Sequence, residues 1–511
     1  MLNIYVSRLP KKEKTMNILL IYPKFPDTFW SFKHALKFIH KKASAPPLGL
    51  LTIASMLPKE WRLKLVDMNV KPLGKKDLDW ADYAFISAMT VQRDSVAEVI
   101  NLCYEAGVKT VCGGPLFTTE PQAFSGIDHL VLNEAEITLP LFLDDFAKNK
   151  LKPIYSTDEY ADIKQTLPPM WDLINFKDYA SISIQYTRGC PFNCEFCNIT
   201  SMLGHRMRIK SAEQILFELD GLYSRGWHGG IFFVDDNLIG NKKALREELL
   251  PALIDWRKNK TGIAFNTEVS INLADDNELM NLMVKAGFNM VFVGIETPDD
   301  DNLAECSKIQ NRNRDLAADV RRIQSAGMQV QGGFIVGFDN DSPSTFQSLV
   351  EFIQNTGIVT AMVGILQAPA GTRLYKRMQE AGRLISNFTG DNVAGATNII
   401  PKMNINLLTS RYKELIRHIY SPEVYYQRVK TFLKDYQLPK IKPDVSFRKI
   451  WQDVNAFILS IFKLGIFGKE RKQYWGLVFW TLFKKPKLFP LAITFSVYGY
   501  HYRKVSETHV G

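Results

Sequence analysis

The sequence predicts an α/β protein with a doubly wound parallel sheet, then a partial (β/α)6 barrel, then a helical carboxyl-terminal region. Three observations support this class. Short apolar strands alternate with helices in two separate runs, a proline-bearing connector at 151–179 divides the runs, and only helical segments follow residue 383. Strands that are apolar nearly throughout are typical of parallel sheets covered by helices on both faces.

The composition indicates a globular protein of several domains. A chain of 511 residues is too long for one core, and 46% hydrophobic with 23% charged residues excludes bulk disorder. The net charge of +10 permits an anionic partner, either nucleic acid or an acidic membrane surface. Residues 1–15 are basic without an apolar core, so we interpret them as an amino-terminal extension of a cytoplasmic protein rather than a secretory signal.

The first run, at 16–150, predicts a Rossmann-like domain. Its expected strands are 17–22, 63–68, 83–89, 110–113 and 129–132, and its expected helices are 48–57, 91–104 and 139–147. Ligands of such sheets bind at the carboxyl ends of the strands, where Ser87, Thr90, Gly113 and Gly114 stand. The alternative is that these glycines only form turns, and composition alone names no ligand.

The second run, at 180–382, predicts three quarters of an eight-fold barrel. Its expected strands are 181–186, 231–234, 263–269, 290–295, 329–336 and 360–366. Reactive groups of barrels lie at the carboxyl ends of the strands. Polar side chains follow four of these strands, at 235–237, 296–298, 337–339 and 367–372. Carboxylates at strand ends often cap the next helix, but four polar segments at one edge exceed what capping alone explains.

Three cysteines follow the first strand of this barrel. Cys190, Cys194 and Cys197 are spaced C-x3-C-x2-C, one ligand short of a closed tetrahedral site. We interpret them as ligands of a 4Fe-4S cluster with one iron left open. The alternatives are a disulfide with a spare thiol, which is rare inside cells, or buried cysteines grouped by chance.

The region 383–511 ends in an aromatic and basic tail. Apolar runs at 457–467, 475–483 and 488–500 are too short to span a bilayer and are flanked by lysines. Such segments contact the headgroup region of membranes, so we expect peripheral contact with the inner face of the membrane. The alternative is a helical cap packed on the barrel. Nucleic acid is not expected, because the aromatics are interleaved with Leu and Ile.

The cysteine loop resembles that of the radical S-adenosylmethionine (SAM) enzymes, whose C-x3-C-x-aromatic-C motif is matched by Cys190, Cys194, Phe196 and Cys197. The resemblance implies that the open iron chelates SAM, and that one electron from a flavodoxin or ferredoxin cleaves it to a 5'-deoxyadenosyl radical. It further implies roles for residues at the strand ends. These are an adenine-side contact for Phe196, the methionine amino group for Asp235 and Asp236, a ribose or methionine contact for Glu296, and adenine lining for the strand after Gln331.

The first domain resembles the cobalamin-binding subclass of these enzymes. The segments 46–50, 66–68, 87–90 and 112–115 match it, which implies that Ser87, Thr90, Gly113 and Gly114 contact cobalamin. Two segments depart from the pattern. Asn69 stands where the lower axial histidine would fall, and residues 133–136 read NEAE instead of GEGE. The chain as a whole is most similar to the branch that contains the hopanoid 2-methylases.

These features predict a cobalamin-dependent enzyme that methylates an unactivated carbon of a small hydrophobic, lipid-like substrate. The alternatives are a radical SAM cyclase or rearrangement enzyme, and a non-catalytic sensor carrying a cluster and cobalamin. Methylthio transfer is disfavoured, because Cys103 and Cys112 cannot form a second three-cysteine site. Cys306 is either a hydrogen donor near the site or a small residue in a turn, and His205 is the histidine nearest the loop in sequence.

Overall fold

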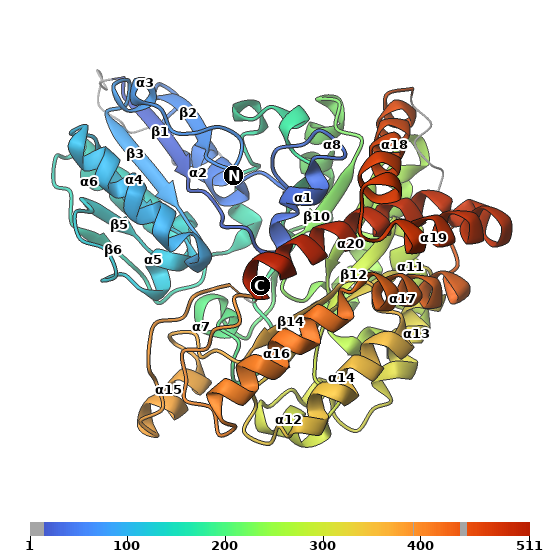
Figure 1. Cartoon of the computed structure of the whole chain (residues 1–511). Coiled ribbons are helices and arrows are strands. Elements are labelled where there is room, and N and C mark those ends of the chain that lie inside the picture. The colour runs from blue at the N-terminus through green and yellow to red at the C-terminus, as the bar shows by residue number, and fades with distance from the viewer. Residues whose placement is uncertain (1–14, 392, 440–446, 511) are drawn as a thin grey trace. The chain divides into compact units, whose positions relative to one another are not determined.

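The computed structural model describes residues 15–391, 393–439 and 447–510, so the predicted extension lies outside the described residues except for Thr15. The chain forms two compact units (Figure 1). Of the described residues, the first unit contains 15–26 together with Pro46–Phe176. The second unit contains Asp27–Ala45 and the described residues from Lys177 onward.

The first unit is a doubly wound sheet of six parallel strands in the order β2-β1-β3-β4-β5-β6. The strands are β1 (Asn17–Tyr22), β2 (Arg62–Asp67), β3 (Tyr83–Ser87), β4 (Lys109–Gly113), β5 (His129–Val131) and β6 (Ile154–Tyr155). The five predicted strands are confirmed, and β6 is an addition inside the predicted connector. Strand order reverses between β1 and β3, and ligands of such sheets bind outside the carboxyl ends at this switch point.

Alternate residues of β1 supply two cores, because successive side chains of a strand point to opposite faces. Ile18 and Leu20 pack with helices on one face, and Leu19 and Ile21 with helices on the other. The first face is covered by α2 (Leu48–Met56) and α6 (Ala135–Ala147), the second by α4 (Arg93–Glu105) and α5 (Pro115–Thr119).

The second unit contains a six-stranded parallel sheet in the order β14-β13-β12-β11-β10-β7, the partial barrel that the sequence predicts. The strands are β7 (Ser181–Ile184), β10 (Gly230–Phe233), β11 (Ala264–Glu268), β12 (Phe288–Glu296), β13 (Gln329–Val336) and β14 (Ala361–Ile365). Helices between them include α8 (Ala212–Ser224), α10 (Leu250–Trp256), α11 (Asn277–Ala286), α13 (Leu316–Ser325) and α14 (Pro343–Thr356). Because β7 and β14 are the edges of this sheet, one side of the barrel is not closed by strand pairing within the described chain.

The carboxyl-terminal region is helical, as predicted. Its helices are α15 (Arg373–Glu380), α16 (Ile405–Ile419), α17 (Pro422–Asp435), α18 (Phe447–Ser460), α19 (Arg471–Lys484) and α20 (Phe489–Val510). A π-helical turn, Ile461–Ile466, continues α18. The long helix α20 lies against α16, α17 and α19 (Figure 1). None of the helices in the described chain has the length and apolar character needed to cross a bilayer.

One segment of the predicted first domain lies elsewhere. Asp27–Ala45, placed by sequence within 16–150, belongs to the second unit. The Phe29 ring stacks on Tyr502 of α20 with centroids 4.3 Å apart, and the Phe29 carbonyl is 3.0 Å from His501 Nε2. Local sequence patterns do not reveal aromatic packing between residues so far apart in the chain. The end of the predicted connector differs too, because the chain up to Phe176 belongs to the first unit.

Candidate active site

The cysteine loop lies in the connection between β8 (Thr187–Arg188) and β9 (Arg208–Ile209), two short strands that pair antiparallel. Cys190 N–H donates to the Gly204 carbonyl at 3.2 Å, and Cys197 N–H donates to the Cys194 carbonyl at 3.2 Å. Gly189 has a φ of +94°, and a Cβ there would come within 2.8 Å of the Arg206 carbonyl oxygen. This connection therefore requires glycine directly before the first cysteine.

All three cysteines are free and half-buried. Burial raises the pKa of Cys190, and it raises the pKa of Cys197 to about 12. Near neutral pH, a thiol with a raised pKa is mostly protonated, and a bound cation that compensates the charge favours the thiolate. Three free thiols in one short loop fit a cluster that takes one thiolate per iron. Within the described chain, no three His, Cys, Asp or Glu side chains are grouped closely enough to hold a single metal ion.

Asp235 follows β10 and is fully buried. Its Oδ1 accepts hydrogen bonds from the backbone N–H groups of Tyr186, at 3.0 Å, and Thr187. This carboxylate therefore fixes the backbone that leads into the cysteine loop. Its Oδ2 has no hydrogen-bond partner within the described chain, and burial raises the pKa of Asp235 to about 7. Burial also raises the pKa of the neighbouring Asp236 to about 6.

Glu268, at the end of β11, is a site residue that sequence reasoning missed. Burial, together with the charges of Asp236 and Asp235, raises the pKa of Glu268 to about 8. Three carboxyl groups on neighbouring strands thus share one edge of the barrel. The sequence contains a signal for Glu268. Asn266 and Glu268 alternate with the buried Phe265 and Thr267, so they point to the opposite face of the strand.

Glu296 ends β12 with a φ of +66°, a conformation that is rare for residues other than glycine and that concentrates at functional sites. Its carboxylate pairs with Lys308 Nζ at 2.7 Å, and both side chains are almost buried. Lys308 Nζ also lies 5.9 Å from the centroid of the Phe196 ring. Lys308 therefore links the predicted residues Glu296 and Phe196, a role that sequence reasoning did not assign.

The predicted residues of the first unit meet at the carboxyl ends of β3 and β4. Ser87 pairs in register with Gly113, and a Cβ on Gly114 would lie 2.5 Å from Ser87 Oγ. Thr90 begins the short 3-10 helix Thr90–Gln92 just beyond β3. This edge combines small side chains with a backbone that glycine alone permits, since Gly114 has a φ of +91°. We call this edge, formed by Ser87, Thr90, Gly113 and Gly114, the cradle, and its small side chains fit a bulky planar cofactor.

Asn69 has a structural role in the turn after β2. Its Oδ1 accepts from the Phe25 N–H at 2.8 Å, and its Nδ2 donates to Asp67 Oδ1 at 2.8 Å. Both ends of the amide are therefore engaged within the first unit. An axial imidazole is absent from this position, as the sequence indicates.

The remaining cysteines and His205 differ in their burial. Cys103 and Cys112 are fully buried in the apolar core of the first unit. Cys306 caps the end of α12 (Asp300–Glu305), is 3% exposed, and has its pKa raised to about 12 by burial. This location agrees with a small residue in a turn. His205 is exposed.

Three family models match consecutive parts of the chain. The B12 binding domain matches residues 39–143, the Radical SAM superfamily matches residues 184–353, and a Domain of unknown function (DUF4070) matches residues 372–511. The first two matches contain the two edges described above.

Two relatives match nearly the whole chain. An uncharacterized methyltransferase of Synechocystis sp. is 38% identical over 97% of this chain and 94% of its own length. The hopanoid C-2 methylase of Rhodopseudomonas palustris is 31% identical over 91% of this chain and 89% of its own length.

Two solved structures share the fold. The cobalamin-dependent radical enzyme OxsB superimposes with a TM-score of 0.62 at 16% identity, covering 97% of this chain and 80% of OxsB. The radical SAM methyltransferase TsrM from Kitasatospora setae gives a TM-score of 0.56 at 14% identity, covering 72% of this chain and 75% of TsrM. From the full-length sequence relatives and the two matched cofactor domains, the chain belongs to the cobalamin-dependent radical SAM methyltransferases, and its cofactors are a 4Fe-4S cluster, SAM and cobalamin.

Proposed function

We propose that the protein methylates an unactivated carbon of a small hydrophobic, lipid-like substrate, and that it is a cytoplasmic enzyme peripheral to the inner face of the membrane. The observation that carries this proposal is a row of exposed apolar side chains on the carboxyl-terminal helices. The relative named as a hopanoid C-2 methylase supports the same substrate class. A flavodoxin or ferredoxin is the proposed source of the electron that the radical SAM family requires.

The proposed roles of the residues follow from their positions at the carboxyl ends of the strands in each unit. Cys190, Cys194 and Cys197 would hold the cluster and leave one iron for SAM, with Phe196 beside the adenine. Asp236 and Glu268 place two carboxyl groups at this edge, and a bound methionine ammonium would favour their ionised forms, so they would orient the methionine amino group, while Asp235 fixes the backbone before the loop.

The other contacts would complete the two cofactor sites. Lys308 offers a cation to the methionine carboxylate, and Glu296 a carboxylate to the ribose. Ser87, Thr90, Gly113 and Gly114 would receive cobalamin. When bound, these cofactors supply the methyl group and the radical chemistry that removes a substrate hydrogen. The protein's share of catalysis is then positioning and exclusion of water.

The apolar face lies on α18 and its π-helical continuation. Exposed apolar side chains recur every three or four residues, which places them on one side of the helix. They are Phe447, Trp451, Val454, Ile458, Phe462 and Ile466, and we call this row the apolar stripe. Phe467, at 82% exposed, and Phe483 of α19, at 81%, extend the exposed apolar surface of these helices.

The charge of this region favours a lipid surface as the partner. Residues 447–510 carry eleven Lys and Arg against three Asp and Glu. Each cation near an anionic leaflet contributes about 1 kcal/mol of attraction, and a buried Phe contributes roughly 1.5–3 kcal/mol. Exposed aromatics beside cations are typical of helices that lie in the headgroup region. A protein partner would have less reason to select so strong a positive excess.

Vesicle binding tests the membrane part of the proposal. The variant Phe467→Glu with Phe483→Glu should bind vesicles of phosphatidylglycerol and phosphatidylcholine at least about tenfold more weakly than the wild type, because two inserting side chains are lost. Phe217→Glu is the matched control, since Phe217 is 67% exposed on α8, outside the carboxyl-terminal helices. Equal binding by the double variant and the control would contradict the proposal.

Lipid analysis tests the substrate class. Lipid extracts from cells with and without the protein are compared by mass spectrometry. A lipid should gain one methyl group, a mass increase of about 14 units or one CH₂, only when the protein is present. An unchanged lipid methylation pattern would count against a lipid-like substrate. A lipid that changes without gaining a methyl group would favour the cyclase or rearrangement enzyme instead.

A further inference from the structure

Helix α15 follows β14, the last strand of the barrel. It contacts and holds the cysteine loop, which follows β7, the first strand. Arg373 Nη2 donates to the Asn193 carbonyl at 2.7 Å, and the Leu374 N–H donates to the Glu195 carbonyl at 3.0 Å. Arg377 makes a bidentate pair with Glu195, with Nε to Oε1 and Nη2 to Oε2 both at 2.7 Å. One helix thus holds the loop by backbone and side chain together.

Glu195 stands between the proposed ligand Cys194 and the proposed adenine neighbour Phe196. Its backbone N–H donates to the Cys306 carbonyl at 2.9 Å, so the residue is held on its other side by the end of α12. The Glu195 side chain is only 12% exposed, whereas Arg377 is 37% exposed. A carboxylate so far removed from water depends on its partner, because an unpaired buried charge is costly.

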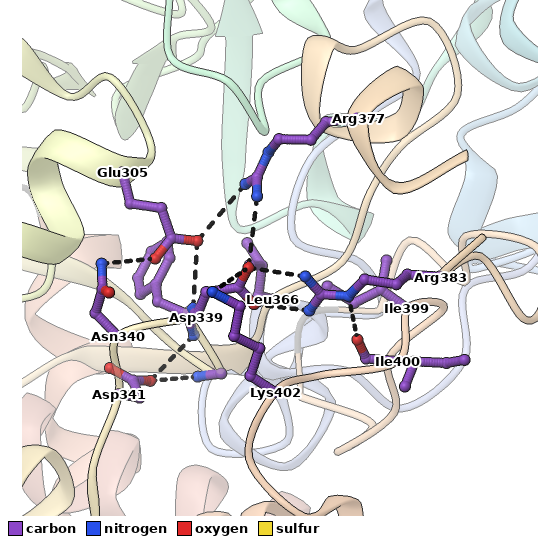
Figure 2. A network of polar contacts seen from close by, with 12 residues as sticks. Glu305, Asp339, Asn340, Asp341, Leu366, Arg377, Arg383, Ile399, Ile400 and Lys402 are labelled. Carbon is purple, nitrogen blue, oxygen red and sulfur yellow. Dashed lines mark hydrogen bonds and ion pairs between the residues drawn. The ribbon is translucent and has the colours of Figure 1, made fainter. Parts of the chain in front are cut away.

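Arg377 is in turn fixed by two carboxylates (Figure 2). Its Nη2 lies 3.6 Å from Glu305 Oε1, and its Nη1 lies 3.5 Å from Asp339 Oδ2. Arg383 completes the network with its own bidentate pair to Asp339 at 2.7 and 2.8 Å. We call Glu195, Glu305, Asp339, Arg377 and Arg383 the clamp.

The position of the clamp matters because the barrel is open. The edge strands β7 and β14 do not pair with each other in the described chain. Glu305 follows β12, Asp339 follows β13, and Arg377 and Arg383 follow β14, while Glu195 belongs to the loop after β7. The clamp therefore connects the loops at the two edges of the sheet, where backbone hydrogen bonding provides no connection.

We propose that Arg377 is a positioning residue that holds the cysteine loop closed across the open side of the barrel. The clamp fixes the peptide between Cys194 and Phe196, so two ligands and the adenine neighbour keep one arrangement relative to the carboxylates of the strand ends. The bidentate geometry is specific to a planar guanidinium, and a lysine at this position retains charge without the paired contacts. The inference rests on the proposed cysteine ligands.

The test uses the full chain with its cluster reconstituted under anaerobic conditions. Arg377→Lys, Arg377→Gln and Glu195→Gln are compared with the wild type for the rate of iron loss to a chelator and for SAM affinity. SAM affinity is measured from the change that SAM produces in the electron paramagnetic resonance spectrum of the reduced cluster. Lys376→Ala is the matched control, since Lys376 is 78% exposed on the same helix and pairs with the exposed Glu380 at 3.9 Å.

Arg377→Gln should lose iron about tenfold faster than the wild type and bind SAM about tenfold more weakly, the range typical for residues that orient metal ligands. Arg377→Lys and Glu195→Gln should give smaller effects of the same sign, because each keeps part of the pair. Lys376→Ala should match the wild type. SAM affinity should be lower even in Arg377→Lys at temperatures well below its melting temperature, which a fold defect alone would not produce.

Two outcomes would overturn the inference. One is wild-type iron loss and SAM affinity in Arg377→Lys and Glu195→Gln, the variants that change least. The other is a lower melting temperature in all three variants with SAM affinity unchanged, which would make the clamp purely structural. Failure of the wild type to hold a cluster would instead refute the proposed ligands, so the two failures are distinguishable.

Discussion

Substitution of Asp235 tests how the barrel positions the cysteine loop. Asp235→Asn keeps an oxygen that accepts from the Tyr186 and Thr187 N–H groups, and it removes the buried charge. Asp235→Ala removes the acceptor as well. If the backbone contact is what this residue provides, the two variants differ strongly in stability.

The magnitude follows from the pKa of the folded state. Burial raises the pKa of Asp235 from 3.8 to about 7, and roughly three pKa units correspond to about 4 kcal/mol. The folded protein binds this proton more tightly than the unfolded chain does. The stabilising contribution is therefore fully present below pH 4 and is lost as the pH rises through about 7. Asn does not ionise, so the stability of Asp235→Asn relative to the wild type should rise by up to about 4 kcal/mol between pH 4 and pH 8.

Asp235→Ala should be less stable than Asp235→Asn at every pH. It leaves two buried N–H groups without their acceptor, each costing about 1–3 kcal/mol. Hydrogen exchange measured by mass spectrometry on the peptide that contains Tyr186 and Thr187 reports both differences, because it reads the opening free energy of this strand end. A pH-independent difference between Asp235→Asn and the wild type would refute the reasoning, as would equal protection in the Asn and Ala variants.

Three further predictions concern other parts of the molecule. Gly114→Ala should weaken cobalamin binding, followed by absorbance titration, because its Cβ would lie 2.5 Å from Ser87 Oγ at a positive φ; unchanged affinity would remove Gly114 from the cradle. Lys210→Met should lower the free energy of unfolding in urea by about 3–5 kcal/mol, because it leaves the buried Glu218 carboxylate without the cation that pairs with it at 2.5 Å. Adding Glu218→Leu should recover most of the loss. A Lys210→Met variant as stable as the wild type would contradict this. Cys306→Ala should form 5'-deoxyadenosine and methylated product within about twofold of the wild-type rates, because its thiol is buried in an apolar cluster; loss of product with 5'-deoxyadenosine retained would make Cys306 a hydrogen donor.

The strands and the cysteine loop could be predicted because their signals are local. An apolar run indicates a buried strand, and the spacing of Cys190, Cys194 and Cys197 predicts a ligand set, without knowledge of the rest of the chain. The order of strands then placed Asp235, Asp236 and Glu296 at one edge, because parallel strands share a direction.

The missed residues depend on contacts across the chain. Arg377 meets Glu195 from 182 positions away, and Phe29 meets Tyr502 across almost the whole sequence. In the sequence, Lys308 cannot be distinguished from a surface lysine, because its ion pair with Glu296 depends on the turn after β12. No periodicity encodes such contacts, since they follow from packing. Glu268 is different, because its alternation with buried neighbours was readable in the sequence.

Transfer of a labelled methyl group tests most directly whether the protein methylates a lipid-like substrate. The protein, reconstituted with its cluster and cobalamin, is given SAM with a deuterated methyl group, a reductant and a lipid extract. We expect one 5'-deoxyadenosine and one S-adenosylhomocysteine for each labelled methyl group in a lipid product, and loss of 5'-deoxyadenosine formation in Cys197→Ser. Formation of 5'-deoxyadenosine with an altered product that carries no label would contradict it.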